Sequence, residues 1–277
     1  MAWTGYLSSF RLLSPMHIGW RKLGNLQQTR PYVTGRSLWG ALTARLTRER
    51  GKSDYDETGS QIDEQLAFTY FYPSTERDIT NLWPWSNQWD EFAWTFLGSY
   101  ASTALENGHS AEAGSLHETE YIAPYTRIEQ PVYLVGYIFE KEGCQLNWRS
   151  ILNKLQLGGE RSYGWGRVHL EVLEEVKNGK CFDYEPVYTE NRVLLKASEV
   201  SRLLAHAIVK DADIGGDRED RGVTIEPLIG RETNKKSVGF GSSFSDPKIC
   251  WVPGGKVSKD ETFQILEKGI WERYPGP

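Results

Sequence analysis

The architecture of this chain depends on one glycine-rich segment, Leu157-Gly158-Gly159-Glu160-Arg161-Ser162-Tyr163-Gly164-Trp165-Gly166-Arg167-Val168. Four of the nine positions 158–166 are glycine, which adopts φ > 0 easily and lets another backbone approach closely. Two arginines add fixed charge, and a tyrosine and a tryptophan add flat aromatic faces. Backbone N–H groups and guanidinium groups together suit phosphate oxygens. The segment is therefore a candidate phosphate-binding loop, with a turn that only reverses the chain as the alternative.

The elements on either side of this loop argue against a nucleotide-cofactor site. The apolar residues of 148–157 are spaced as on one face of a short helix, and residues 168–173 alternate as in a strand. Dinucleotide and P-loop sites need the order strand, loop, helix, and this loop contains no Gly-Lys-Ser/Thr. We expect no cofactor.

Two further motifs lie near the amino terminus, Ser14-Pro15-Met16-His17-Ile18-Gly19 and Pro31-Tyr32-Val33-Thr34-Gly35-Arg36-Ser37-Leu38-Trp39-Gly40-Ala41-Leu42. The first ends a predicted strand over residues 3–13. The second leads into leucines spaced four apart, which predict a helix with Ser37 as its N-cap. The free N–H groups at the start of this helix, beside Arg36, would form an anion site.

Together these motifs resemble those of the RAMP proteins (repeat-associated mysterious proteins), the RNA-binding subunits of CRISPR effector complexes. Family members have a similar SPLHIG strand end, a PYIPGSSLKGAL helix entry and a glycine-rich loop. Thr34 stands here in place of the usual proline, and Trp39 in place of the usual lysine. The motifs lie in family order about 120 residues apart, and the resemblance covers roughly residues 5–175.

We expect an α+β fold, a ferredoxin-like (RRM-like) βαββαβ sandwich with a large insertion. Residues 1–175 would form this domain, with the insertion at about 51–120. Residues 176–277 would form a C-terminal extension or a degenerate second ferredoxin-like half. The remaining expected elements are loops over 17–31, 51–64 and 106–116, strands over 68–73, 120–124 and 132–140, and helices within 89–105 and 199–210.

Charge is distributed unevenly along the chain. The net charge is −5, but residues 1–50 hold eight basic residues and one acidic residue, whereas residues 51–120 hold two basic and thirteen acidic residues. A basic module beside an acidic insertion is typical of a subunit with one nucleic-acid face and other faces that contact proteins. Solvated charges that cluster without a role are the alternative.

The composition favours a cytoplasmic protein without metal or membrane anchor. Cys144, Cys181 and Cys250 form no CxxC pair, so the sequence indicates neither a zinc site nor a disulfide framework. No apolar run reaches 18 residues, and no signal peptide is evident. The acidic cluster 211–221 lacks the register of an EF-hand and is interpreted as a solvated loop. The segment 239–244 is either a second backbone-clamping loop or a β-turn.

Catalytic chemistry has little support in the sequence. Type III backbone subunits of the RAMP family usually carry an Asp between the two amino-terminal motifs, where it supports metal-dependent cleavage, but residues 20–30 contain no acid. His17 could act as a general acid or base in metal-free cutting of repeat RNA, although non-catalytic members share this histidine. His206, among apolar neighbours, is interpreted as a core residue.

The resemblance implies a non-catalytic subunit that binds guide RNA in a type III CRISPR complex. Residues 18–24 look most like the type III-D subunits that cap the 5′ tag, while a backbone or 3′-end position, a repeat-processing endoribonuclease and a structural adaptor stay open. Its partners would be guide RNA, other RAMP subunits, the large subunit and, indirectly, target RNA. The residues expected to contact RNA are His17, Trp20, Arg21, Lys22, Arg30, Gly35, Arg36, Ser37, Gly158, Gly159, Arg161, Ser162, Tyr163, Gly164, Trp165, Gly166 and Arg167.

Overall fold

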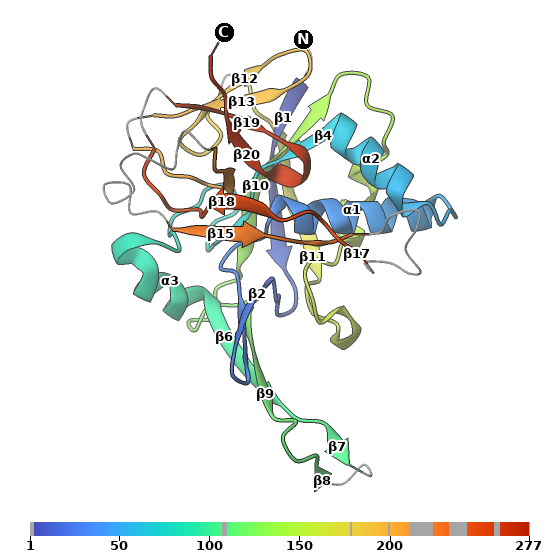
Figure 1. Cartoon of the computed structure of the whole chain (residues 1–277), viewed down its shortest axis with the longest axis vertical. Coiled ribbons are helices and arrows are strands. Elements are labelled where there is room, and N and C mark those ends of the chain that lie inside the picture. The colour runs from blue at the N-terminus through green and yellow to red at the C-terminus, as the bar shows by residue number, and fades with distance from the viewer. Residues whose placement is uncertain are drawn as a thin grey trace.

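The chain forms mixed α+β structure that is rich in sheet and has few helices (Figure 1). The computed structural model describes residues 3–106, 110–177, 179–198, 200–210, 224–232, 243–257 and 261–276. None of the helices within these ranges is long and apolar enough to cross a membrane. The acidic cluster 211–221 and most of the segment 239–244 lie outside the described residues.

A five-stranded antiparallel sheet forms the centre of the molecule. It contains β1 (Trp3–Leu12), β4 (Leu66–Phe68), β5 (Tyr72–Ser74), β10 (Tyr133–Lys141) and β11 (Val168–Glu175). The strand order is β11-β1-β10-β4, and β5 also pairs with β10. The expected long strands at β1, β10 and β11 are confirmed. The segment 68–73 was expected to be one strand but contributes to two, β4 and β5.

One face of the central sheet carries helices. The helix α1 (Gly35–Glu49) buries Leu38, Leu42 and Leu46, as their spacing predicts. Its N-cap is Thr34, whose Oγ1 accepts the Ser37 N–H at 3.3 Å, so the expectation that Ser37 caps this helix is wrong. Thr34 keeps an extended backbone, which makes it the last residue before the helical turn.

The structure differs from expectation at one loop and at one short helix. Residues 51–64 were expected to be a loop, but α2 (Tyr55–Gln65) forms there, capped by Asp54 and packed through the fully buried Ile62. The expected short helix before the glycine loop is the 3-10 helix η2 (Arg149–Lys154). A second 3-10 turn, η3 (Arg161–Tyr163), lies inside the glycine loop.

A separate four-stranded sheet forms an arm that extends away from the body (Figure 1). Its order is β2-β3-β9-β6, comprising β2 (Gly19–Leu23), β3 (Leu26–Thr29), β9 (His117–Ile122) and β6 (Leu97–Ser102). The loop expected over 17–31 is therefore the β2–β3 hairpin. Strand β9 pairs with β3 and joins this hairpin to the rest of the arm sheet. The strand expected near residue 120 is confirmed as β9.

Short elements fill the rest of the insertion. The 3-10 helix η1 (Ser86–Gln88) precedes α3 (Trp89–Phe96), and the chain then enters β6 rather than continuing as a helix toward residue 105. Beyond the arm sheet, β7 (Leu105–Glu106) pairs with β8 (Ser110–Ala111), where a loop was expected.

The C-terminal part forms a seven-stranded sheet. Its order is β12 (Glu185–Tyr188), β13 (Val193–Lys196), β19 (Thr262–Ile265), β20 (Trp271–Arg273), β14 (Ala207–Ile208), β18 (Lys248–Trp251) and β15 (Ile225–Leu228). Two small elements accompany it, the pair β16 (Arg231–Glu232) and β17 (Ser243–Phe244), and the 3-10 helix η5 (Glu267–Gly269). The helix expected over 199–210 is wrong for the described residues 200–210, because Leu203, Leu204 and Ala205 are all buried around a loop that leads into β14.

The core divides into two clusters, one on each side of the central sheet. The first packs the sheet against α1 and η2 around residues such as Phe10 and Trp148. The second packs the other face against the C-terminal sheet and includes Tyr70, Phe139 and Trp271. The central strand β10 is therefore covered on both faces, as its two-sided apolar sequence predicts.

Candidate nucleic-acid interface

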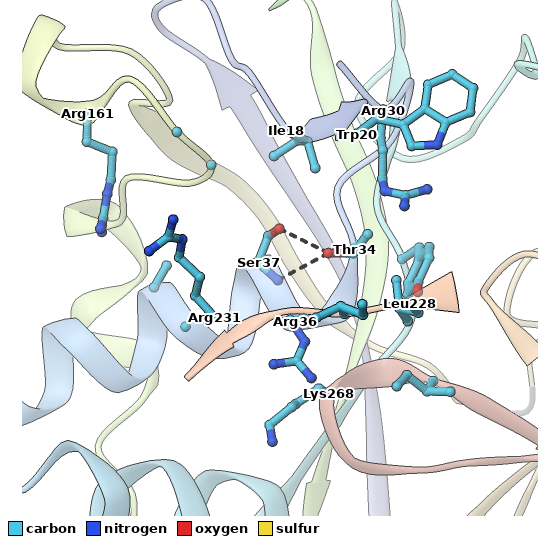
Figure 2. Close-up of a pocket in the computed structure, with 18 of the residues that line it drawn as sticks. Ile18, Trp20, Arg30, Thr34, Arg36, Ser37, Arg161, Leu228, Arg231 and Lys268 are labelled. Carbon is cyan, nitrogen blue, oxygen red and sulfur yellow. Dashed lines mark hydrogen bonds between the residues drawn. The ribbon is translucent and has the colours of Figure 1, made fainter. Parts of the chain in front are cut away.

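A pocket of about 480 Å³ opens where α1 begins, beside the glycine loop and the β2–β3 hairpin (Figure 2). The C-terminal part closes it from the other side. The lining residues are Ile18, Gly19, Trp20, Arg30, Thr34, Arg36, Ser37, Gly40, Ala41, Tyr70, Gln156, Gly158, Gly159, Arg161, Pro227, Leu228, Ile229, Arg231, Lys268 and Ile270. One cavity thus unites five parts of the chain that are distant in the sequence, namely 18–41, Tyr70, 156–161, 227–231 and 268–270.

The charge of the pocket is strongly positive. Its lining includes five basic side chains, Arg30, Arg36, Arg161, Arg231 and Lys268, and none of the described lining residues is acidic. The pocket also borders the first turn of α1, whose N–H groups and dipole favour an anion. The arrangement therefore suits a ligand with several negative charges, such as a phosphodiester backbone.

Glycines allow the backbone to close around the start of α1. A side chain at Gly230 would collide with the Arg36 side chain, which lies directly over this glycine. A side chain at Gly35 would collide with the backbone of Lys268 and Gly269 in η5. The C-terminal part thus contacts the first residues of α1 at two places. Gly230 lies against the Arg36 side chain, and Lys268 and Gly269 lie against Gly35.

The glycine loop is joined to the Ser14–Gly19 motif by backbone hydrogen bonds. The Gly159 N–H donates to the His17 carbonyl at 2.8 Å, and the Gly166 N–H donates to the Pro15 carbonyl at 2.7 Å. Gly158 and Gly166 have φ of +79° and +77°, and a side chain on either would collide with a carbonyl oxygen. These contacts hold the two motifs side by side.

A buried polar network lies beneath Trp20 and connects it to the C-terminal part. The carboxylate of Glu226 on β15 accepts from Arg30 Nη1 at 2.6 Å, from His206 Nε2 at 2.7 Å and from Trp20 Nε1 at 3.0 Å. The Tyr70 hydroxyl donates to His206 Nδ1 at 2.8 Å, which leaves Nε2 as the protonated nitrogen. His206 is fully buried, as its apolar neighbours suggested.

The network fixes the protonation of its members. Burial alone would raise the pKa of Glu226, but the hydrogen bond from His206, the charge of Arg30 and the indole N–H lower it to about 2. Burial lowers the pKa of His206, against the hydrogen bond to Glu226 that raises it. At neutral pH the network holds a carboxylate, a neutral imidazole and a guanidinium.

Comparison with known proteins identifies the family of this chain. A family model for the RAMP superfamily matches residues 9–169, which is more than half of the 277 residues. The chain belongs to the RAMP superfamily. No curated protein matches the sequence.

One solved structure shares the fold of this RAMP protein. A chain of the type III-B Cmr-beta structure bound to cognate target RNA and AMPPnP is 11% identical, with a TM-score of 0.51 over 90% of this chain and 84% of that one. A chain of apo Cmr-beta is 12% identical over 61% of this chain and 96% of that one, but its TM-score of 0.36 is too low to support an argument. The first match shows that the shared fold covers 90% of this chain and extends beyond the residues that the family model matches.

The pocket of this RAMP protein brings together seven of the seventeen residues expected to contact RNA. These seven are Trp20, Arg30, Arg36, Ser37, Gly158, Gly159 and Arg161. Among the cations of the pocket, Lys268 Nζ lies 4.0 Å from Asp63 Oδ2. The Arg30 side chain is only 10% exposed and lies 2.6 Å from Glu226 Oε1. Its charge is already neutralised, so the structure favours a role in holding Trp20 over a role in binding phosphate.

The other ten expected residues lie outside the pocket. Some support it, since His17 is 7% exposed and donates from Nδ1 to the Glu120 carbonyl at 2.7 Å. Trp165 packs edge-on against Tyr121, and Tyr163 is 79% exposed. The ten residues are His17, Arg21, Lys22, Gly35, Ser162, Tyr163, Gly164, Trp165, Gly166 and Arg167. Their contact with RNA stays a prediction.

Sequence reasoning missed the contribution of the C-terminal part. Arg231, Lys268 and the apolar residues of 227–229 line the pocket, although nothing local in their sequence indicates a phosphate site. Among the described residues, no three His, Cys, Asp or Glu side chains gather closely enough to hold a metal ion.

Proposed function

We propose that this RAMP protein is a non-catalytic, guide-RNA-binding subunit of a cytoplasmic type III CRISPR effector complex. The observation that carries the proposal is the basic pocket, in which the glycine loop, the start of α1 and the C-terminal part place cationic groups around one cavity. A phosphodiester backbone is the ligand that such a surface suits best. Its partners would be guide RNA, other RAMP subunits and the large subunit, with target RNA reached indirectly.

Within this proposal the basic residues have different roles. Arg36, Arg161, Arg231 and Lys268 would bind phosphates, and Gly158 and Gly159 would let the RNA backbone come close to the loop. The resemblance of residues 18–24 to type III-D subunits supports a position at the 5′ tag of the guide.

We also propose a ferredoxin-like arrangement for the amino-terminal part of the chain. The strand order β11-β1-β10-β4, with α1 after β1 and η2 before β11, supports a ferredoxin-like βαββαβ unit in residues 1–175. In this interpretation η2 replaces the second helix, and the arm is part of the insertion.

Two observations support the proposed absence of nuclease activity. The hairpin residues 20–30 contain no carboxylate that could anchor a metal or a general base. The ring of His17 is buried and hydrogen-bonded to a main-chain carbonyl, which suits a structural role better than proton transfer to a substrate.

A cleavage assay tests this proposal. Purified full-length protein is incubated with labelled CRISPR repeat RNA and target RNA, with and without Mg²⁺ or Mn²⁺, beside the His17→Ala variant. We expect binding of repeat RNA without products in every condition. Metal-independent cutting by the wild type that is lost in His17→Ala would overturn the proposal in favour of a repeat-processing endoribonuclease.

A further inference from the structure

The indole of Trp20 is fixed by a hydrogen bond and by neighbouring guanidinium groups, although it stands on an exposed hairpin. The other residues of β2 are exposed, whereas Trp20 is half-buried and borders the pocket. Its only hydrogen-bonding group, Nε1–H, donates to Glu226 Oε2 at 3.0 Å. The guanidinium of Arg21 lies 4.0 Å from the ring centroid and that of Arg30 lies 5.9 Å away.

The group that holds this indole comes from the other half of the chain. Glu226 is 206 residues away in the sequence, and its second oxygen accepts from Arg30 and His206. His206 is itself fixed by the buried Tyr70 hydroxyl. A flat ring, fixed in orientation at the edge of a cationic pocket, provides a stacking platform for a nucleobase where the exposed Arg21 guanidinium, which lies over the ring, gives way to the base.

We propose that Glu226 is a positioning residue that fixes Trp20 as a stacking platform for one base of the RNA bound in the adjacent pocket. This inference rests on the proposed function, since it assumes that the pocket binds an RNA backbone. Arg36, Arg161 and Arg231 would hold phosphates, while Trp20 would hold one base that is turned out of the strand. Glu226 and His206, which do not line the pocket, would not touch RNA.

An abasic scan of the RNA tests the proposal directly. Synthetic repeat RNAs, each with one abasic nucleotide at a successive position, are titrated against the full-length protein. For the wild type we expect one position at which loss of the base weakens binding by about 5- to 100-fold. In Trp20→Ala this position-specific penalty should vanish, because no platform remains. In Glu226→Gln it should shrink, because the indole is no longer fixed by a charged acceptor.

The chain offers a matched control for Glu226. Glu140 holds a similar but more exposed arrangement outside the pocket lining, accepting from Trp148 Nε1 at 2.8 Å and from Arg149 Nη2 at 2.6 Å. Glu140→Gln removes the same kind of charged acceptor from an indole N–H and an arginine, and should leave the abasic profile unchanged. Should Glu226→Gln fail to fold, Trp20→Phe replaces it, because phenylalanine keeps an aromatic ring but loses the hydrogen bond to Glu226 together with part of the stacking area, and the penalty should then shrink in that variant.

The outcomes separate this inference from the proposed function. If RNA binding depends on Arg161 and Arg231 but the abasic profile is the same in wild type and Trp20→Ala, the platform is overturned and the proposed function stands. If folded Glu226→Gln keeps the full penalty, or if Glu140→Gln reduces it equally, the positioning role is overturned. If the wild type does not bind repeat RNA at all, both proposals are overturned.

Discussion

At the scale of single residues, the glycine loop shows that glycines close in sequence have different roles. Gly166 has positive φ and lies against the Leu157 carbonyl, whereas a side chain at Gly159 would meet its nearest neighbour, His17 Cδ2, at 3.5 Å. Only the first position requires the absence of a side chain. Gly164 also has positive φ, but a side chain there would meet open space.

This difference gives a stability prediction. Gly166→Ala should lower the free energy of unfolding by about 2 kcal/mol or more, because it adds left-handed strain to a collision with main-chain oxygen. Gly159→Ala is the matched control and should change it by less than about 0.5 kcal/mol. Denaturant unfolding of both variants measures the difference, and equal stabilities would contradict this account of the loop.

At the scale of elements, the start of α1 combines a structural and a functional requirement. Thr34 caps the helix from an extended backbone, and its hydroxyl lies 3.0 Å from the Ser37 hydroxyl. Both residues line the pocket, so the cap also shapes the site where the helix exposes its N–H groups.

The capping geometry predicts unequal effects of two similar substitutions. Thr34→Ala should lower the free energy of unfolding by about 1 kcal/mol, because it removes the acceptor for the Ser37 N–H. Ser37→Ala keeps that acceptor and should cost less than about 0.5 kcal/mol. Thermal or denaturant unfolding of the two variants measures these losses. A larger loss of stability in Ser37→Ala than in Thr34→Ala would mean that Ser37 is the N-cap.

Elements with strong periodicity could be predicted from the sequence, whereas weakly patterned ones could not. The strands β1, β10 and β11 and the helix α1 carry clear apolar spacing, because each packs a continuous stripe into the core. The helix α2 escaped prediction because it buries chiefly Ile62 and two small residues, so its sequence is almost uniformly polar. The β2–β3 hairpin escaped because its residues are mostly exposed.

The candidate site could be predicted only in its amino-terminal half. Arg36 and Arg161 stand in motifs whose glycines mark close backbone approach. Arg231 and Lys268 reach the pocket through tertiary packing of the C-terminal sheet, and no local pattern encodes that contact. Arg30 looked equivalent to the other arginines because its partner Glu226 is distant in the sequence.

At the scale of the whole molecule, the C-terminal sheet completes both the core and the pocket. The second core cluster unites residues of both parts, and the Glu226 network joins them at the edge of the pocket. Because the folded state lowers the pKa of Glu226 from its ordinary 4.5 to about 2, this carboxylate stabilises the fold above about pH 4.5. That contribution is lost as the pH falls toward 2.

Acid unfolding should reveal how much the Glu226 carboxylate contributes to stability. At neutral pH the wild type should be more stable than Glu226→Gln by about 3 kcal/mol, since one pKa unit corresponds to about 1.4 kcal/mol. The difference should diminish steadily between pH 4.5 and pH 2. Urea unfolding of both proteins across this range provides the measurement, and a difference that does not vary with pH would mean that the charge of Glu226 contributes nothing.

The central claim is that the cationic pocket formed by both parts of the chain binds an RNA backbone. Its most direct test is the salt dependence of repeat-RNA binding by the wild type, the pocket variant Arg161→Ala/Arg231→Ala and the control Arg48→Ala/Arg127→Ala. The control residues are exposed arginines outside the pocket lining. The pocket variant should bind more weakly and lose about one to two units of the slope of log affinity against log salt, while the control keeps the wild-type slope. Equal slopes for wild type and pocket variant, or an equal loss in the control, would contradict the claim.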